Sequence, residues 1–324
     1  MKIDGPVALE TLASESERAF YPGRDDARTR NGALFADIRP GFTFDRGSRI
    51  FTIGSCFARN IEEHLTGYDL PTLRFAVPKD EWPNRPNGLL NEHNVGTIAQ
   101  RIERAIAGEP APEDTVVQTA RGFEDLLVVA GADASRDRTF ERRREIDEVY
   151  TELARSDVVL VTLGMIEAWV DNRSGTYLNR LPPTRKIRKT PRRYSVEIMD
   201  VRKAQALLEP SVRLLTDRGI KVILLVSAVP LRATFSGDDV VVANSYSKAV
   251  LRVCAQRVAA TLPGVDYFPA YEIVTSGGLG SYEEDQRHVV DDVTGEFVRF
   301  LIERYEAPAP VAAALNGAAA YLPA

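Results

Sequence analysis

Two adjacent side chains that can act as nucleophiles, Ser55 and Cys56, lie where an apolar run breaks into Gly-Ser-Cys and a helical pattern begins. A serine hydroxyl is a weak nucleophile at neutral pH and needs a general base, usually a histidine oriented by a carboxylate. A thiol at a helix N-terminus ionises more easily, although a free cysteine is more often a small buried side chain. The turn therefore offers serine or cysteine chemistry, with a plain helix cap at Ser55 and a buried Cys56 as the structural alternatives.

The chain has three histidines, so the search for a general base is short. His64 follows Ser55 by nine residues on the same expected helix, which is more than two turns away and out of reach. His93 lies at a loop-to-helix junction, where it can cap the helix or line a site. Asp285 precedes His288 by three residues, which places both on one side of a turn and lets the carboxylate fix the imidazole tautomer. An ordinary polar surface turn can have the same pattern, so Asp285 and His288 are candidates at this stage.

Four apolar runs define the elements that must position these side chains. They are residues 49–55, 156–164, 220–230 and 265–274. The first three are continuous rather than alternating, which is typical of strands buried on both faces of a parallel sheet. Amphipathic helical segments lie between the runs or after them, at about 91–107, 139–155, 198–218, 242–262 and 294–305. This alternation predicts an α/β fold, a doubly wound three-layer α/β/α domain with a central, mostly parallel sheet. The carboxyl ends of its strands are where such folds bind ligands, and Ser55 lies at one of them.

The rest of the chain divides around this predicted domain of residues 49–305. Residues 1–48 are polar with scattered aromatic residues and are expected to form an N-terminal arm packed on the domain. Residues 173–195 interrupt the alternation as an excursion over the edge of the sheet, with six Lys or Arg among the nine positions 185–193. That cluster can attract an acidic ligand or simply form a solvated loop. Residues 306–324 are rich in Ala and Pro and are expected to form a tail.

Composition excludes several classes of function. The net charge of -5 gives no overall electrostatic reason to bind nucleic acid or an anionic membrane. We find no secretory signal and no apolar stretch long enough to span a membrane, so a cytoplasmic protein is expected. Cys56 and Cys254 lack the spacing of a zinc site or a disulfide framework, and Cys254 is expected to be a small buried hydrophobic residue. No metal-ligand spacing or phosphate-binding glycine loop is present, so no metal or other cofactor is expected.

Several stretches resemble one family. The sequence "GSCFA" at 54–58 resembles the name-giving motif of the GSCFA family, which is related to the SGNH (GDSL-like) hydrolase superfamily and to PC-esterases. The resemblance covers roughly residues 40–303. It extends to "RPNGLLNEHNV" at 85–95, "VTLGMIEAWVDNRSGTYLN" at 161–179, "LVSAVPLRATF" at 225–235 and "ANSYSKAVLR" at 243–252. It implies an SGNH-hydrolase-like (flavodoxin-like) fold.

The resemblance also implies roles for single residues. Ser55 matches the nucleophile, whose backbone N–H also helps to bind the oxyanion, and Gly88 matches a second backbone donor. Asp285 and His288 match the carboxylate and the base of the triad. Cys56 is then expected to be a buried packing residue, and the weaker alternatives are an auxiliary thiol and the nucleophile.

One departure from the superfamily pattern concerns the oxyanion hole. Ile166 stands where the superfamily has an Asn whose side chain donates to the oxyanion. Loss of such a donor typically costs about 100- to 1,000-fold in turnover. The candidate replacements are Asn91, Asn94 and Asn179, of which Asn91 is the preferred one. The residues expected to line the substrate pocket are His93, Glu167, Trp169 and Asn179, although a structural role for Trp169 is equally compatible with the sequence.

The sequence therefore predicts a serine esterase or acyltransferase that acts on an O-acyl group, most simply an acetyl ester of a carbohydrate or polar metabolite. The alternative is a non-catalytic saccharide-binding or assembly protein that retains the fold. The substitution at Ile166 favours this alternative, whereas Ser55, Asp285 and His288 argue against it.

Overall fold

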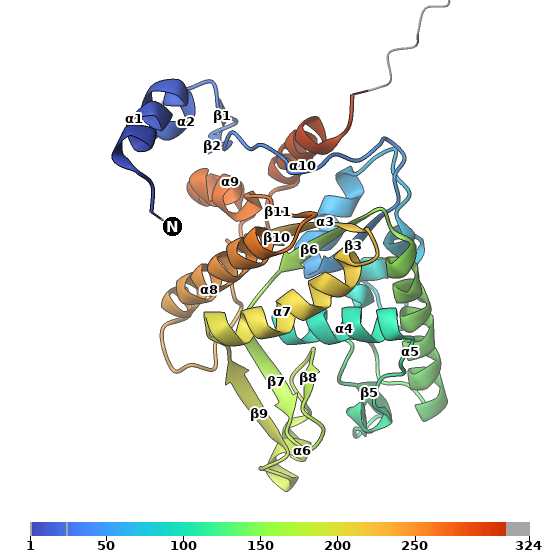
Figure 1. Cartoon of the computed structure of the whole chain (residues 1–324). Coiled ribbons are helices and arrows are strands. Elements are labelled where there is room, and N and C mark those ends of the chain that lie inside the picture. Colours follow the sequence, from blue (N-terminus) through green and yellow to red (C-terminus); the bar gives the residue numbers. More distant parts are fainter. Residues whose placement is uncertain (1, 24, 309–324) are drawn as a thin grey trace, which may run out of the picture.

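A four-stranded parallel sheet lies at the centre of the computed structural model, which describes residues 2–23 and 25–308 (Figure 1). In spatial order its strands are β11 (Val265–Tyr267), β10 (Lys221–Val226), β6 (Val158–Leu163) and β3 (Ile50–Gly54). Every residue of β3 and β6 is buried. Because both faces of these strands are covered, they carry continuous apolar runs rather than an alternating pattern.

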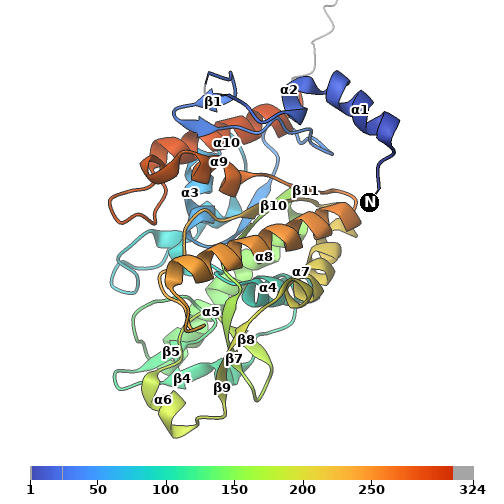
Figure 2. The same ribbon diagram turned by 90° about the vertical axis from the view of Figure 1, so that its left-hand side faces the viewer.

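Helices cover both faces of the sheet, as Figures 1 and 2 show. Phe51 and Ile53 of β3 share one core with α4 (Val95–Ala107), α5 (Arg136–Thr151), α7 (Val201–Thr216) and α8 (Val240–Thr261). Ile50 belongs to the opposite core, with α3 (Cys56–His64), α9 (Ala270–Ser276) and α10 (Asp291–Tyr305). The alternation follows from the two-residue period of a strand. The predicted three-layer α/β/α fold with a central parallel sheet is confirmed.

The order of the strands explains where a site can form. β3, β6, β10 and β11 are neighbours in their order along the chain. On the outer side of β3 a single parallel bridge joins Arg49 to Asp69, where a doubly wound sheet would have its next strand. The chain that leaves β3 thus first passes along the free side of β3, whereas the later strands β6, β10 and β11 are added on the opposite side. Ligands bind at such a switch point, beyond the carboxyl ends of the strands, and Ser55 lies there.

The fourth apolar run is shorter as a strand than the sequence suggested. β11 ends at Tyr267, and α9 begins at Ala270 instead of the strand continuing to residue 274. Pro269 precedes the helix. A proline has no N–H for the sheet ladder and its fixed φ suits a helix start, so it ends the strand and opens the helix.

A second, smaller sheet projects below the main one in Figure 1. It is antiparallel, with the order β8 (Thr176–Leu178), β7 (Glu167–Asp171) and β9 (Tyr194–Ile198). The short helix α6 (Thr184–Lys189) connects β8 to β9, and the hairpin of β4 (Val116–Gln118) and β5 (Phe123–Asp125) lies nearby. The predicted excursion of residues 173–195 therefore contains regular structure.

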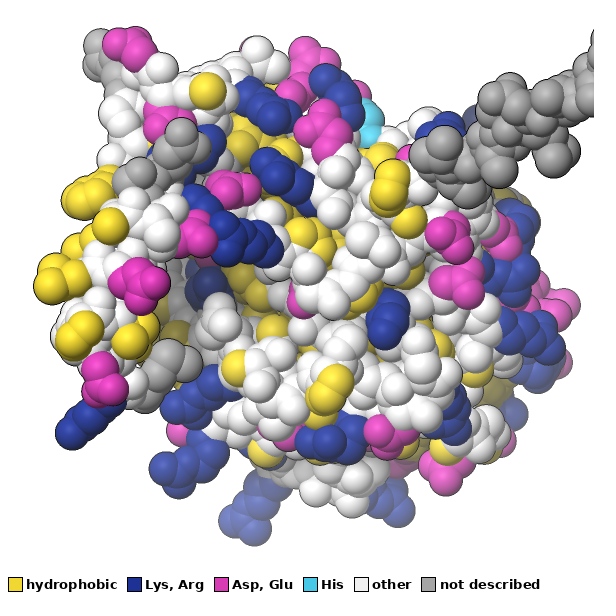
Figure 3. All heavy atoms as spheres, turned by 45° about the horizontal axis from the view of Figure 1, so that its top comes forward, with side chains coloured by type: hydrophobic (Ala, Val, Ile, Leu, Met, Phe, Trp, Pro, Cys, Tyr) yellow, Lys and Arg dark blue, Asp and Glu magenta, His cyan; other side chains and the backbone are white. Residues whose placement is uncertain are grey.

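The N-terminal segment contains two helices that its weak periodicity did not predict. They are α1 (Gly5–Ser14), with Pro6 in its first turn, and α2 (Ser16–Ala19), followed by the hairpin of β1 (Thr29–Arg30) and β2 (Ala33–Leu34). No residue of α1 is buried, and apolar side chains of this arm gather at the left of Figure 3. The arm of residues 1–48 and the domain of residues 49–305 remain predicted boundaries. Of the expected tail, residues 309–324 lie outside the described residues.

Candidate active site

The turn between β3 and α3 requires glycine before the serine. Gly54 has φ of +147°, and a Cβ on it would lie 2.4 Å from the carbonyl oxygen of Thr162 on the neighbouring strand β6. Only glycine adopts this conformation and permits this approach without strain. Ser55 is then the N-cap of α3, and its Oγ accepts a hydrogen bond from Phe57 N–H at 3.4 Å. The hydroxyl is thus held at the positive end of a helix, where an oxyanion is stabilised.

Asp285 and His288 form a hydrogen-bonded pair in a tight turn. His288 Nδ1 lies 2.5 Å from Asp285 Oδ2, and Asp285 Oδ1 accepts the backbone N–H groups of Arg287 and His288 at 2.9 Å each. A bridge between Tyr282 and Val289 closes the base of the turn. The backbone donors, more than the imidazole, lower the pKa of Asp285 to about 2. The carboxylate therefore stays ionised and accepts the Nδ1 proton, which leaves Nε2 as the basic atom of a neutral His288.

Arg287 links this turn to the turn at Ser55. Its positive charge lowers the pKa of Cys56, the neighbour of Ser55, and that of His93. Arg287 Nε is buried with no hydrogen-bond partner among the described residues. The charge of Arg287 therefore acts on the neighbour of Ser55 from within the turn that carries His288. Within the described part of the chain, however, no hydrogen bond joins Ser55 Oγ to His288.

The thiol of Cys56 is partly buried beside the serine. Burial raises its pKa, and the charges of Arg287 and Arg85 offset only part of that effect. A protonated thiol is a poor nucleophile, so the electrostatics favour Ser55 over Cys56. The other cysteine, Cys254, is fully buried in the core between α8 and the sheet, as predicted.

A buried segment around Asn91 lies against the serine turn. Glu92 N–H donates to the carbonyl oxygen of Gly54 at 2.7 Å, and Asn179 Nδ2 donates to the carbonyl oxygen of Asn91 at 2.5 Å. Asn179 Oδ1 also accepts His93 N–H at 3.1 Å, so both ends of this side chain fix the segment. Asn91 Oδ1 is buried without a partner among the described residues. Since the two ends of a side-chain amide can be exchanged by a flip, Asn91 is free to present a donor.

Asn94 and His93 have different surroundings. Asn94 caps α4, because its Oδ1 accepts Thr97 N–H at 2.9 Å, and is thereby committed to the helix. The carbonyl oxygen of His93 accepts Met165 N–H at 3.0 Å, next to Gly164, where a Cβ would lie 2.4 Å from that oxygen. Burial and then the charge of Arg287 lower the pKa of His93 to about 4. His93 is therefore neutral and weakly basic at neutral pH.

Gly88 lies in a short 3₁₀ helix, Pro86–Leu90, close to α3. Its N–H donates to the carbonyl oxygen of Arg85 at 2.9 Å. Asn87 ties the helix to α3, because its Nδ2 donates to Glu62 Oε2 at 2.7 Å. The role of Gly88 in an oxyanion hole stays a prediction, and it requires the Gly88 N–H to leave Arg85.

Ile166, Glu167 and Trp169 follow β6 into β7. Ile166 is buried in the core, and its backbone N–H donates to Ser247 Oγ at 3.2 Å. The carboxylate of Glu167 accepts the Thr234 hydroxyl at 2.5 Å and Phe235 N–H at 2.7 Å. It thereby holds the loop after β10.

Trp169 packs against that same loop. It meets Phe235 edge-on at 5.3 Å between ring centroids, and its Nε1 is buried without a partner among the described residues. A substrate-binding role for Trp169 and Glu167 stays a prediction.

Sequence reasoning did not single out two cations, Lys248 and Arg287. Lys248 on α8 is 1% exposed, and its Nζ donates to the carbonyl oxygens of Gly164 and Val229 at 2.8 Å each. Burial lowers its pKa to about 7, and Cys56 partly offsets this effect. The available signals were a lysine at a core-facing position of an apolar helix and an arginine between Asp285 and His288.

Two searches of the described residues, 2–23 and 25–308, found nothing. No group of three or more His, Cys, Asp or Glu side chains could hold a metal ion. No helix in this part of the chain is both long and apolar enough to span a membrane.

Comparisons with known proteins point to one family. The model of the GSCFA family matches residues 49–300. No curated protein matches the chain. Among solved structures, the chain is similar to a variant of an acetyl-xylooligosaccharide esterase from Geobacillus, at 13% identity and a TM-score of 0.34, over 82% of this chain and 98% of the other. A likeness this loose carries no argument about chemistry.

Proposed function

Because the chain belongs to the GSCFA family, we propose that it is a serine-dependent O-acyl esterase or acyltransferase. The observation that carries the proposal is the hydrogen-bonded Asp285–His288 pair, and it is supported by Arg287 of the same turn, whose charge acts on Cys56 beside Ser55. The residue types and their order match the triad logic of acyl transfer, in which the base is oriented by an ionised carboxylate. The proposed substrate class is an acetyl ester of a carbohydrate or another polar metabolite.

The proposed reaction has two halves. Ser55 Oγ attacks the ester carbonyl while His288 Nε2 takes the hydroxyl proton, and the carbonyl oxygen becomes an oxyanion. The C–O bond to the alcohol then breaks, and His288 returns the proton to the leaving oxygen. Water or the hydroxyl of an acceptor next attacks the acyl-serine and loses its proton to His288. The bond between the acyl carbon and Ser55 Oγ then breaks, and His288 returns the proton to Ser55 Oγ. Asp285 keeps the imidazole in the required tautomer throughout.

The oxyanion would be stabilised at the N-terminus of α3. The candidate donors are the backbone N–H of Ser55, the side chain of Asn91, and Gly88 once its bond to Arg85 opens. Arg287 adds a positive charge, and among the described residues no carboxylate forms an ion pair with it. In this proposal it replaces the donor lost at Ile166.

His288 is a better general base than His93. The pKa of His93 is lowered to about 4, well below neutral pH, so its neutral ring has little affinity for the serine proton. Among the described residues no carboxylate forms a hydrogen bond with the His93 ring, whereas Asp285 orients His288.

The alternative is a non-catalytic saccharide-binding or assembly protein. It is favoured by Ile166 and by the lack of a hydrogen bond between Ser55 and His288 in the described contacts. Catalytic hydrogen bonds are often long when no substrate is bound. The absence of a Ser55–His288 hydrogen bond is therefore weaker support for the alternative than the Asp285–His288 pair is for the enzyme.

The deciding experiment is hydrolysis of p-nitrophenyl acetate, with intact-mass detection of an acetyl group on Ser55. We expect a burst of p-nitrophenol and a mass increase of one acetyl group, both lost in Ser55→Ala. The His288→Ala variant should lose the burst. Cys56→Ser serves as the matched control at the adjacent position and should keep the adduct. Wild-type rates in both Ser55→Ala and His288→Ala would refute the triad and leave the binding function.

A further inference from the structure

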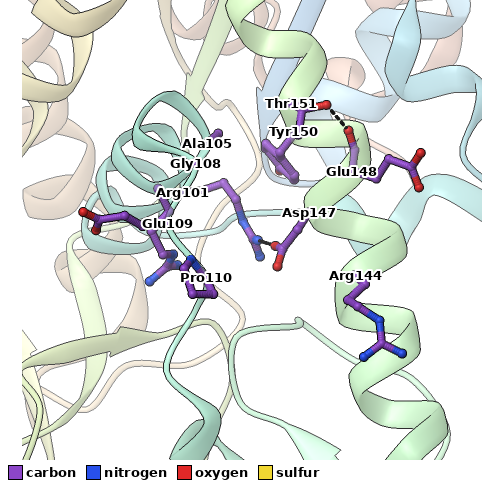
Figure 4. Close-up of a pocket in the computed structure, with 11 residues that line it drawn as sticks. Arg101, Ala105, Gly108, Glu109, Pro110, Arg144, Asp147, Glu148, Tyr150 and Thr151 are labelled. Carbon is purple, nitrogen blue, oxygen red and sulfur yellow. Dashed lines mark hydrogen bonds and ion pairs between the residues drawn. The ribbon is translucent and has the colours of Figure 1, made fainter.

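A separate cavity of about 360 Å³ lies between α4 and α5, and its lining residues are not those of the candidate active site (Figure 4). The wall combines apolar surface with three arginines and three carboxylates, and the carboxylates are Glu109, Asp147 and Glu148. The apolar side chains include Ala105, Pro110 and Tyr150, and the cations are Arg101, Arg104 and Arg144.

Arg101 forms a neutralised wall of this cavity. Its Nε donates to Glu92 Oε1 at 2.9 Å and its Nη1 to Asp147 Oδ1 at 2.6 Å. The guanidinium also lies 4.7 Å from the centre of the Tyr150 ring. Arg101 is 4% exposed, so its geometry is fixed by buried contacts on three sides.

Arg104, three residues further along α4, is not neutralised in this way. Its Nε is buried with no hydrogen-bond partner among the described residues, and none of the recorded ion pairs of that part of the chain includes it. Burial and the like charge of Arg101 lower its pKa to about 10, and the carboxylates of Glu92 and Asp147 offset part of this effect. A buried N–H group without a partner costs stability. The Nε–H of Arg104 is therefore available to donate a hydrogen bond to an anion.

Within the described residues, neither Glu109 nor Glu148 forms an ion pair with Arg104. Figure 4 shows the side chains of Glu109 and Glu148 turned to opposite sides of the cavity, away from the Arg101–Asp147 pair. Arg144, which is exposed, adds a second cation with no recorded ion pair in the described residues. The cavity thus holds two arginines, Arg104 and Arg144, that have no ion pair within the described residues and lie beside an apolar wall.

We propose that this cavity binds a small organic anion, whose phosphate or carboxylate group pairs with Arg104 and whose apolar body packs on Ala105, Pro110 and Tyr150. A planar guanidinium matches either oxyanion through two parallel hydrogen bonds. Pockets of this size with a few placed polar groups are typical of small-molecule sites. The inference is independent of the proposed esterase activity.

Calorimetric titration of the full-length protein tests the site with phenyl phosphate, benzoate and, as the neutral analogue, phenol. We expect one of the two anions to bind with one-to-one stoichiometry and phenol to bind at least about tenfold more weakly, as expected for loss of a charged hydrogen bond. Arg104→Gln should weaken anion binding by at least about tenfold for the same reason. Arg202→Gln, an exposed position on α7 that does not line the cavity, should bind as the wild type does.

Ala105→Leu provides a second variant that keeps every charge and fills the cavity instead. It should also weaken binding, which separates the site from general attraction to arginines. The anion that binds with the higher affinity shows whether the site prefers a phosphate or a carboxylate group. Failure of both anions to bind the wild-type protein would overturn the proposal, as would unchanged affinity in a folded Arg104→Gln or Ala105→Leu variant.

Discussion

Asp285 Oδ2 lies 2.5 Å from His288 Nδ1, while the other carboxylate oxygen accepts two backbone N–H groups of the same turn. The turn therefore holds its own carboxylate in place and uses that carboxylate to orient the imidazole. Both functions depend on the three-residue spacing. The arrangement is local, so it was accessible to sequence reasoning.

The first prediction concerns this pair. Asp285→Asn retains an acceptor for the backbone but allows the amide to donate to Nδ1, which favours the wrong imidazole tautomer. We expect kcat on p-nitrophenyl acetate to fall by up to about 10⁴-fold, as the equivalent change does in serine proteases, with little loss of stability. Glu284→Gln, an exposed neighbour, is the control. An Asp285→Asn rate close to that of the wild type would contradict the orienting role.

The second prediction concerns Arg287. Its positive charge lowers the pKa of both His93 and Cys56, so Arg287→Met should raise both pKa values. NMR titration of His93 and the pH dependence of Cys56 alkylation measure these shifts without reference to activity.

The same variant tests the part of Arg287 in catalysis. If Arg287 stabilises the oxyanion, Arg287→Met should lower kcat on a neutral ester by about 100-fold or more and leave KM nearly unchanged. Arg287→Lys should recover part of the rate. If the pKa values of His93 and Cys56 rise as expected but kcat is unchanged, Arg287 acts on both residues but has no catalytic role.

The third prediction concerns Gly54. Gly54→Ala places a Cβ 2.4 Å from the Thr162 carbonyl oxygen at φ of +147°, so the backbone of the serine turn must shift. Gly47→Ala is the matched control, since Gly47 has φ of +84° but open space around its Cβ. Urea unfolding should give a loss of about 1–2 kcal/mol for Gly47→Ala and about 3 kcal/mol or more for Gly54→Ala. Equal losses would show that conformation, and not the contact with β6, determines the need for glycine.

The fourth prediction concerns the pH dependence of stability that Lys248 causes. Burial lowers its pKa from 10.5 to about 7 in the folded chain. Between these pH values the unfolded chain binds the extra proton, so this residue makes the folded state more stable as the pH rises, by up to about 1.4 kcal/mol per pH unit.

A comparison with Lys248→Met isolates that effect from other titrating groups. The free energy of unfolding of the wild type should rise relative to that of Lys248→Met as the pH increases from about 7 towards 10. Denaturant unfolding at several pH values measures the difference. A constant difference across this range would show that Lys248 is not buried as described.

Local patterns predicted much of this protein. Continuous apolar runs identified β3, β6 and β10, because strands covered on both faces have no polar side to show. The same pattern predicted too long a fourth strand, because the apolar residues continue past Pro269, where the strand has ended and a helix begins. Glycine before Ser55 and Asp285 three residues before His288 were equally readable, because turn conformation and short-range hydrogen bonds depend on neighbours in the chain.

The parallel α/β architecture, the glycine-serine turn and the Asp285–His288 pair follow from local sequence. Two other arrangements depend on the packed fold: Lys248 donates to the carbonyl oxygens of Gly164 and Val229, and Asn179 fixes the segment beside Gly54. These hydrogen bonds join residues that are 19 to 88 positions apart in the chain. Their formation depends on how the layers pack and which side chains are buried together, and no local periodicity encodes that information.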